Sequence, residues 1–380
     1  MSDGIEEDSQ AKEEQEQKDE STESGSIKPV TRDFKYEVLP EDTTQYDCVM
    51  LFYGSTKYGP KDNNYTAFAA KMTTKYKNIS SYMWISSLSI YGISHYRDDV
   101  KNLSDLSDNS PNDALNVATI THEFAHTMGA IDLYSNSSRE TGGVTVYPFG
   151  EYSMQSADQA GHDAYHMMGF NWVNPYVLDA SKDYGVDSLE LTINDLHSSG
   201  DAIIVTPSWN NNDSPFDEYI LVELFDTQSV NSYKVSNRMT GVRVYHVDSR
   251  LFDLNGYDLT TDTKTNCVIP FTNTYGTAAG PTNSHPVLNN YKNYDLVHQI
   301  RKNKVDGKNE KIEYITTDHA KSDNWFVKGD SFSLEKYADQ FLDKGALDSG
   351  LTSLGWTFEI TSLNTNEHGA TATIRFNKAL

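Results

Sequence analysis

One short run, THEFAHTMGAIDLY (Thr121–Tyr134), constrains the fold of this chain more than any other feature of its sequence. It places His122 and His126 four residues apart, which puts both imidazoles on the same face of a helix. A glycine follows at position 129, where a helix can end, and Asp132 comes three residues later. We therefore expect a helix that ends sharply, followed by a turn that brings Asp132 back towards the two histidines.

These three side chains are of the types that bind zinc in catalytic sites. Zinc binds imidazole nitrogens at about 2.0–2.1 Å, and a catalytic site uses three protein ligands and keeps a fourth position open. Glu123 follows the first histidine, where its carboxylate can hold the zinc-bound water and take its proton during attack on a peptide carbonyl. We predict His122, His126 and Asp132 as zinc ligands, Glu123 as the catalytic base and Gly129 as the residue that permits the turn.

Three other interpretations compete with a catalytic zinc site. The two histidines could lie on a helix that binds no metal, or the zinc could be purely structural. Glu123 argues against a structural zinc, which has no use for a base, and the later glycine and aspartate lower the chance of an accidental match by about two orders of magnitude. The third arrangement takes a glutamate from a second helix further along the chain. Val146 stands where that glutamate is expected, and neither Glu140 nor Glu151 lies at the required distance.

A methionine downstream fits the same site. The run EYSMQS carries Met154 in a polar, turn-prone setting, and the extended zinc motif is accompanied by a methionine turn beneath the metal. We predict Met154 as the floor of the zinc site. The sequence names no second donor to the oxyanion. In some metzincins, the group that this chain is similar to, a tyrosine stands two residues after the methionine, and here that residue is Ser156. Tyr152, His162 and Tyr165 lie nearby in the sequence and are interpreted as structural.

The composition of the chain divides it into parts and excludes several classes of partner. Residues 1–25 hold ten acidic and two basic residues and no aromatic, so a tail over 1–33 is predicted to be disordered. The formal net charge of −24 argues against nucleic acid or anionic lipid as a partner. No run of 18 apolar residues predicts a transmembrane segment, and two cysteines cannot form a disulfide scaffold. The chain opens acidic, without the pattern of a signal peptide, so we expect a cytosolic protein or one whose signal has been removed.

The periodicity of apolar residues predicts an α+β front and a mostly β rear. A buried strand is predicted at Asp47–Gly54, helical spacing at Tyr65–Tyr76, one or two strands at Tyr82–Tyr96, and a helix running from Ser110-Pro111 to Gly129. Further strands are predicted at Glu218–Phe225 and Gly241–Asp248. The chain closes with an alternating hairpin whose buried faces are Trp356, Phe358, Ile360 and Ala370, Ala372, Ile374, Phe376.

By these landmarks the chain resembles the immune-inhibitor-A-like secreted metalloproteases of bacteria, which belong to the metzincin group. The resemblance spans about residues 115–250 and rests on the runs HEFAHTMGAIDLY, YSMQS, HDAYHMMGFNWVNP (His162–Pro175), DEYILVEL (Asp217–Leu224) and GVRVYHVD. The chain departs from the family in having Ile131 where a proline is common before the aspartate. It also departs in HDAYHMMGF, where the family usually has a tryptophan and a lysine.

The resemblance implies a fold, an activity and a location. It implies a metzincin-like catalytic domain, with a twisted sheet and an active-site helix, at 34–180. A β-rich, sandwich-like C-terminal domain follows at 181–380. The implied protein is an extracellular or cell-surface zinc endopeptidase that acts on protein or peptide substrates, and we expect it to be a monomer. The alternative is a surface binding protein on a protease-like scaffold with little or no turnover.

The resemblance also implies Ca²⁺ as a second candidate ion, because family members often bind it. His246 and Asp248 share one strand face and could hold a second ion, but are interpreted as ordinary packing residues. The acidic stretch Asp253–Asp262 matches no defined calcium loop and is interpreted as a solvated loop.

Overall fold

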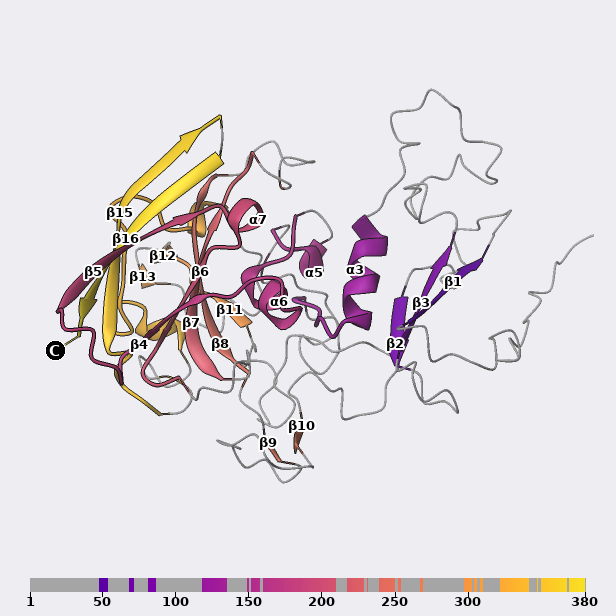
Figure 1. The fold of residues 1–380 in the computed structure, drawn as a ribbon, viewed down its shortest axis with the longest axis horizontal. Coiled ribbons are helices and arrows are strands. Elements are labelled where there is room, and N and C mark those ends of the chain that lie inside the picture. The colour runs from indigo at the N-terminus through magenta and orange to yellow at the C-terminus, as the bar shows by residue number, and fades with distance from the viewer. Residues whose placement is uncertain are drawn as a thin grey trace, which may run out of the picture. The chain divides into compact units, whose positions relative to one another are not determined.

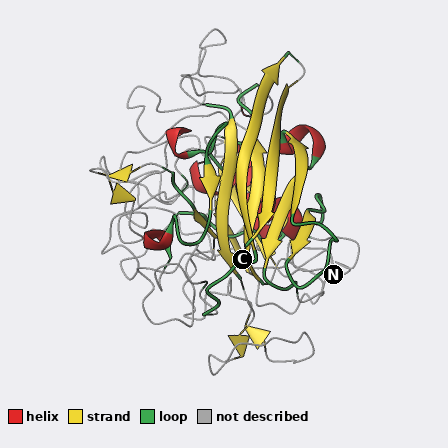
Figure 2. Cartoon of the chain, turned by 90° about the vertical axis from the view of Figure 1, so that its left-hand side faces the viewer, coloured by secondary structure: helices red, strands yellow, loops and turns green. Residues whose placement is uncertain are grey.

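Strands form most of the regular structure in the described part of this protein (Figure 2). The computed structural model describes residues 48–53, 68–71, 81–86, 118–134, 149, 152–157, 160–209, 217–228, 231, 239–249, 252–253, 267–268, 297–302, 304–305, 308–309, 322–341, 347, 350–367 and 369–379. These residues mix helices with sheets, as the sequence predicts. The predicted tail, 1–33, lies outside them.

A small mixed sheet precedes the helix that carries the histidines (Figure 1). Its strands are β1 (Val49–Tyr53), β2 (Phe68–Lys71) and β3 (Ser81–Ser86). The order is β1-β3-β2, with β1 parallel and β2 antiparallel to β3. Helix α3 (Ala118–Thr127) packs against β2 and β3.

The two strands predicted in this region are confirmed by β1 and β3, and the remainder of the predicted strand region, 87–96, lies outside the described residues. The predicted helical spacing over Tyr65–Tyr76 is wrong, because the chain forms β2 there. A short apolar run has no strong preference of its own, and its backbone hydrogen bonds to β3 decide its structure.

Two larger sheets make up the rear of the chain (Figure 1). The five-stranded sheet has the order β11-β8-β7-β6-β4 and contains β4 (Tyr176–Asp179), β6 (Ala202–Thr206), β7 (Glu218–Phe225), β8 (Gly241–Asp248) and β11 (Val297–Gln299). All its neighbours are antiparallel except β4 and β6. The four-stranded sheet is fully antiparallel, with the order β14-β15-β16-β5, and contains β5 (Ser188–Asn194), β14 (Ser331–Phe332), β15 (Trp356–Asn366) and β16 (Gly369–Lys378).

Several short elements complete the described structure. They are α5 (Met154–Ala157), α6 (Ala164–Gly169), α7 (Leu196–Ser199), β9 (Phe252–Asp253), β10 (Cys267–Val268), β12 (Lys304–Val305), β13 (Lys308–Asn309) and the 3₁₀ turns Ser322–Asn324 and Ala338–Gln340. None of the helices in the described ranges is long and apolar enough to cross a membrane.

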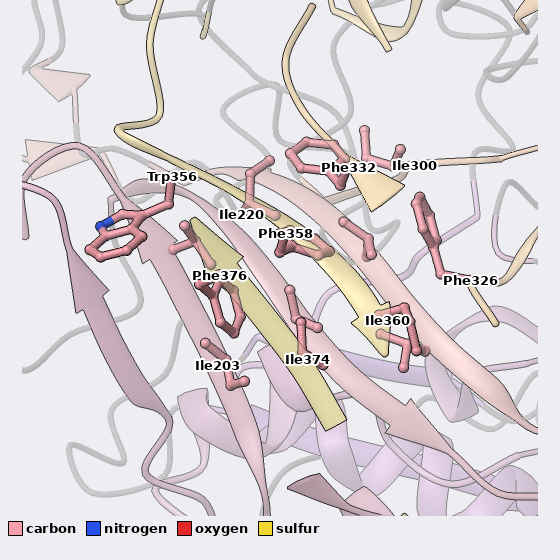
Figure 3. Close-up of a cluster of buried hydrophobic side chains, with 14 of the residues drawn as sticks. Ile203, Ile220, Ile300, Phe326, Phe332, Trp356, Phe358, Ile360, Ile374 and Phe376 are labelled. Carbon is pink, nitrogen blue, oxygen red and sulfur yellow. The ribbon is translucent and has the colours of Figure 1, made fainter. Parts of the chain in front are cut away.

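The two large sheets share one apolar core (Figure 3). Alternate residues of β7 and β8, such as Ile220 and Val244, meet Phe358, Ile374 and Phe376 from the other sheet. The predicted terminal hairpin is confirmed: β15 pairs with β16, and all seven side chains predicted to be buried are buried. Two sheets packed face to face in this way form a sandwich.

The opposite face of the five-stranded sheet supports the helical segments that follow α3. Tyr219, Leu221 and Tyr245 on this face belong to one buried cluster with Ile131 and Tyr165. Strand β4 precedes the predicted domain boundary at residue 180 and pairs with β6, which follows it. The division into domains at 34–180 and 181–380 stays a prediction.

Candidate metal centre

The end of helix α3 builds the first part of the site. Gly129 has φ +103°, a left-handed conformation that only glycine adopts without strain. Its amide donates to the His126 carbonyl at 3.1 Å, and the amide of Ala130 donates to the Ala125 carbonyl at 3.0 Å. This pair of bonds is a Schellman motif, which ends a helix and reverses the chain. Gly129 thus ends the helix as the sequence predicts.

Three predicted ligands converge immediately after this turn. The His122 and His126 Nε2 atoms lie 3.1 Å apart, and the Asp132 Oδ1 atom lies 3.2 Å and 3.1 Å from them respectively. Within the described residues, this is the one group of three such side chains that could hold a metal ion. All three side chains are largely buried.

The other nitrogen of each ring fixes which atoms face the centre of the group. His122 Nδ1 donates to the Met154 carbonyl and His126 Nδ1 donates to the Ala130 carbonyl, each at 2.9 Å. A carbonyl can only accept, so in both neutral rings the proton is on Nδ1 and the Nε2 lone pair points inward.

Two imidazole lone pairs and a carboxylate oxygen at this spacing repel one another unless a cation lies between them. A tetrahedral metal at about 2.0–2.1 Å from each ligand atom holds those atoms about 3.3–3.4 Å apart, which is close to the spacing observed. Bonds from the outer ring nitrogens to carbonyls are also the arrangement that orients histidine ligands in metalloproteins. The residues present therefore fit a bound metal ion.

The electrostatics of the group favour positive charge at its centre. Burial alone would raise the pKa of Asp132, but its hydrogen bonds to His122 and His126 and their charges lower that pKa to about 2. Burial alone would lower the pKa of His126, but its hydrogen bond to Asp132 and the aspartate charge raise it. A metal ion and protons thus compete for the same lone pairs.

The predicted base, Glu123, lies on the same helix and is buried. It follows His122 directly and precedes His126 by three residues, so its Cβ is a neighbour of His126 on the helix surface, at about 5–6 Å. A carboxylate next to the first histidine of such a pair is where a base would act on metal-bound water, and this role of Glu123 stays a prediction. The site therefore has the residue types for proton transfer beside a metal.

The segment that carries Met154 supports the site through its backbone. The Met154 carbonyl accepts the bond from His122, and the Gln155 side-chain amide donates to the His122 carbonyl at 3.4 Å. The Gln155 carbonyl also accepts from the Leu133 amide at 2.7 Å, beside Asp132. Met154 thus contacts His122 through its main-chain oxygen, and its role as the floor of the site stays a prediction.

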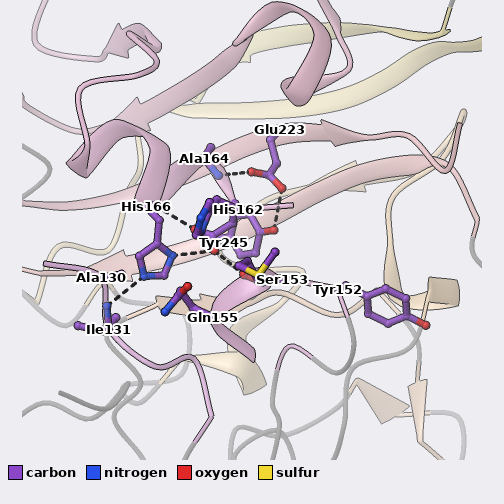
Figure 4. Close-up of polar contacts among 12 residues, drawn as sticks. Ala130, Ile131, Tyr152, Ser153, Gln155, His162, Ala164, His166, Glu223 and Tyr245 are labelled. Atoms are coloured by element: carbon purple, nitrogen blue, oxygen red, sulfur yellow. Dashed lines mark hydrogen bonds and ion pairs between the residues drawn. The ribbon is translucent and has the colours of Figure 1, made fainter. Parts of the chain in front are cut away.

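A buried polar network contacts the loop that carries Asp132 through the Ile131 amide (Figure 4). The Asp163 Oδ2 atom accepts from Ser153 Oγ and from His166 Nδ1, both at 2.8 Å. His166 Nε2 in turn accepts from the Ile131 amide at 3.3 Å. These three side chains were not among the predicted site residues; the one local signal was Asp163, a typical N-cap residue at the start of α6.

The five-stranded sheet carries a buried ion pair that also bonds to these segments. Glu223 pairs with Arg243 and accepts from the Tyr245 hydroxyl at 2.9 Å. Its other oxygen accepts from the Ala164 amide at 2.6 Å, and Arg243 donates to the Tyr152 carbonyl at 2.5 Å. Both side chains of the ion pair thus also bond to main-chain groups of the segments around the loop that carries Asp132.

The side chains considered as second oxyanion donors pack against aromatic rings or are buried. The Tyr152 ring packs on Trp325, and burial holds the pKa of the Tyr165 hydroxyl far above its usual value. His162 packs against Phe170 and Trp172, with ring centroids 5.5 and 5.9 Å apart. The interpretation of these residues as structural stays a prediction.

The second-ion candidates differ in what the structure describes of them. His246 Nε2 lies 2.9 Å from Glu218 Oε1, so its partner is a carboxylate on the neighbouring strand. In the described residues, no third ligand makes this pair a metal-binding group. The stretch 254–262 lies outside the described residues, and calcium binding stays a prediction.

The chain matches none of the known protein-family models, and none of the curated proteins shows significant similarity to it. The resemblance to the metalloprotease family therefore rests on the motifs alone. The convergence of His122, His126 and Asp132 is what supports a metal centre in the described residues.

Proposed function

We propose that this protein is a zinc-dependent endopeptidase. The observation that carries the proposal is the convergence of two imidazole lone pairs and one carboxylate oxygen at 3.1–3.2 Å spacing, with both outer ring nitrogens bound to carbonyls. Two nitrogens and one oxygen suit zinc better than calcium or magnesium, which prefer oxygen ligands. Three protein ligands leave a position free for chemistry.

The proposed reaction is hydrolysis of a peptide bond. When bound, zinc supplies Lewis acidity, which acidifies water and polarises a carbonyl group. Glu123 takes one proton from the attacking water as the new carbon–oxygen bond forms, and returns it to the amine nitrogen as the carbon–nitrogen bond breaks. The Met154 and Ala130 carbonyls hold the Nδ1 protons of His122 and His126, so that each ring would offer its Nε2 lone pair to the ion.

The wider assignment follows from the motifs. Asp132 as the third ligand, Met154 beneath the histidines and the sandwich of strands behind them agree with the order of features in the immune-inhibitor-A-like metalloproteases. We include an extracellular or cell-surface location and protein or peptide substrates in the proposal. It would place the chain in the metzincin group.

The test compares the wild-type chain with Glu123→Gln, which keeps the shape of the side chain and removes its basicity. Zinc content and cleavage of casein or a peptide library are measured on both. We expect both to bind zinc and the variant to lose about 100- to 10,000-fold in cleavage rate, the usual contribution of a general base. Glu140→Gln is the matched control, and it should cleave at the wild-type rate.

Equal cleavage by wild type and Glu123→Gln would rule out this mechanism. Zinc bound by the wild type without cleavage of any substrate would favour a binding protein on a protease-like scaffold. A metal-edge anomalous signal between His122, His126 and Asp132 would identify the ion independently of activity.

A further inference from the structure

A single buried carboxylate connects the two segments that support the metal ligands. Asp163 lies at the N-terminus of α6 and is almost fully buried. Its Oδ1 atom accepts from the His166 amide at 3.1 Å, which is an ordinary helix cap. Its Oδ2 atom does something a cap does not require: it binds Ser153 and the His166 ring at the same time.

The main chain on both sides of Asp132 depends on these segments. The Ile131 amide donates to His166 Nε2 at 3.3 Å, and the Leu133 amide donates to the Gln155 carbonyl at 2.7 Å. The Ile131 and Leu133 side chains are buried in one apolar cluster, so the loop cannot rotate freely about its anchors. These two bonds fix the backbone on both sides of Asp132. They thereby limit the directions that the Asp132 carboxylate can take.

The His166 ring has one arrangement of protons that satisfies both of its contacts. Its Nε2 accepts from an amide N–H, so its proton is on Nδ1, where it donates to Asp163. The carboxylate thus fixes the tautomer and the orientation of a ring that fixes the loop. Burial opposes the charge of Asp163, but His166 and Ser153 lower the pKa of this aspartate far below its ordinary range.

We propose that Asp163 and His166 are a positioning pair that fixes the Asp132 loop and thereby sets the affinity and coordination geometry of the metal centre. Neither side chain is a ligand. Their effect reaches the ion through the Ile131 amide and, by way of Ser153, through the segment whose carbonyl binds His122. The identity of the ion as zinc rests on the proposed function; the positioning role does not depend on peptide cleavage.

The test measures metal binding by the full chain, without any substrate. Zinc affinity is obtained by competition with a chromogenic chelator, and the visible absorption of the cobalt-loaded protein reports its coordination geometry. His166→Leu removes the acceptor for the Ile131 amide. We expect its zinc Kd to rise about 10- to 100-fold, as is typical when the partner of a metal ligand is lost, and its cobalt spectrum to change.

Two variants separate positioning from general damage to the fold. His166→Gln keeps an acceptor near the position of Nε2, so it should recover most of the affinity. His162→Leu is the matched control, because it removes a buried histidine whose ring lies beside that of His166, with centroids 6.4 Å apart, while it leaves the bonds of His166 to Asp163 and the Ile131 amide in place. It should leave the zinc Kd and the cobalt spectrum unchanged, and far-ultraviolet circular dichroism checks that every variant is folded.

The outcomes distinguish the two proposals. A folded His166→Leu with wild-type zinc Kd and cobalt spectrum would overturn the positioning role while leaving the protease proposal intact. The positioning role also fails if His162→Leu weakens binding as much as His166→Leu. A wild-type chain that binds neither zinc nor cobalt would overturn the metal centre itself.

Discussion

The metal centre and the sandwich core are stabilised in opposite ways. The core between the two large sheets is a set of apolar side chains, each in contact with several others and none of them tied to one partner. Around the ligands, each contact has one donor and one acceptor: His122 with the Met154 carbonyl, and His126 with the Ala130 carbonyl. The core tolerates exchange of one apolar residue for another of similar size, whereas the centre does not tolerate loss of a single partner.

The two regions also contribute to the free energy of folding with opposite signs. Burying the core stabilises the fold by itself, because apolar surface leaves water. Bringing three electron-pair donors together at the centre opposes folding until a cation neutralises them. The rest of the fold must therefore hold the site in place, so a change in the core should lower stability without altering metal binding.

The largest effect is expected from a hole in the core. Phe358 is 1% exposed and packs between Phe332 and Phe376, with ring centroids 5.1 and 5.4 Å away. Phe358→Ala should lower the free energy of unfolding in urea by about 3–5 kcal/mol, while the folded protein keeps its zinc Kd. Phe358→Leu should cost much less. A change in zinc Kd with little loss of stability would contradict the separation of the two regions.

An intermediate effect is expected from pH at His162, whose buried ring packs against Phe170 and Trp172. Burial, with a smaller contribution from the charge of His166, lowers the pKa of His162 to about 4 from 6.5. The unfolded chain therefore binds a proton more readily. The stability that a neutral His162 permits is full above pH 6.5 and is lost as the pH falls towards 4.

The metal-free wild type and His162→Leu should differ in their pH dependence. Between pH 7 and pH 4.5 the wild type should lose about 2–3 kcal/mol more than the variant in urea unfolding. Parallel losses in the two proteins would show that this ring is not held neutral in the folded state.

The smallest effect is expected at the solvent-exposed side of the terminal hairpin. Arg375 and Glu190 form an ion pair at 2.8 Å, with each side chain 48% exposed. Arg375→Ala should change the free energy of unfolding by less than about 1 kcal/mol and leave zinc binding unaltered, because water and salt screen the pair. A loss comparable to that of Phe358→Ala would mean that surface charge, and not the apolar core, holds the hairpin.

The sequence predicts features that depend on neighbours along the chain. Alternation at Trp356, Phe358 and Ile360 identifies a buried strand face, because side chains in a strand point to opposite sides in turn. The spacing of the motif likewise predicts that His122, His126 and Asp132 lie close together, since one helix and one glycine turn bring them there. The strand at Phe68–Lys71 is not predicted, because its structure depends on pairing with another strand.

The sequence does not predict the contacts that the site makes with residues far away along the chain. The Ile131 amide meets a ring 35 residues away, and the Tyr152 carbonyl meets Arg243 91 residues away. Glu223 and Arg243 lie in strands that read as ordinary buried β-structure, and only the fold shows that they face the helical segments. No short pattern contains both partners of these contacts.

The ion pair of Glu223 and Arg243 also bears on how such a chain can change over evolutionary time. The pair is fully buried, and it donates to the Tyr152 carbonyl and accepts from the Ala164 amide. A recombination that exchanged the sandwich strands for those of another protein would leave that carbonyl and amide buried without partners, at a cost of about 1–3 kcal/mol each. We therefore expect such an exchange to destabilise the segments around the candidate metal site unless the two strands that carry this pair are transferred together with them.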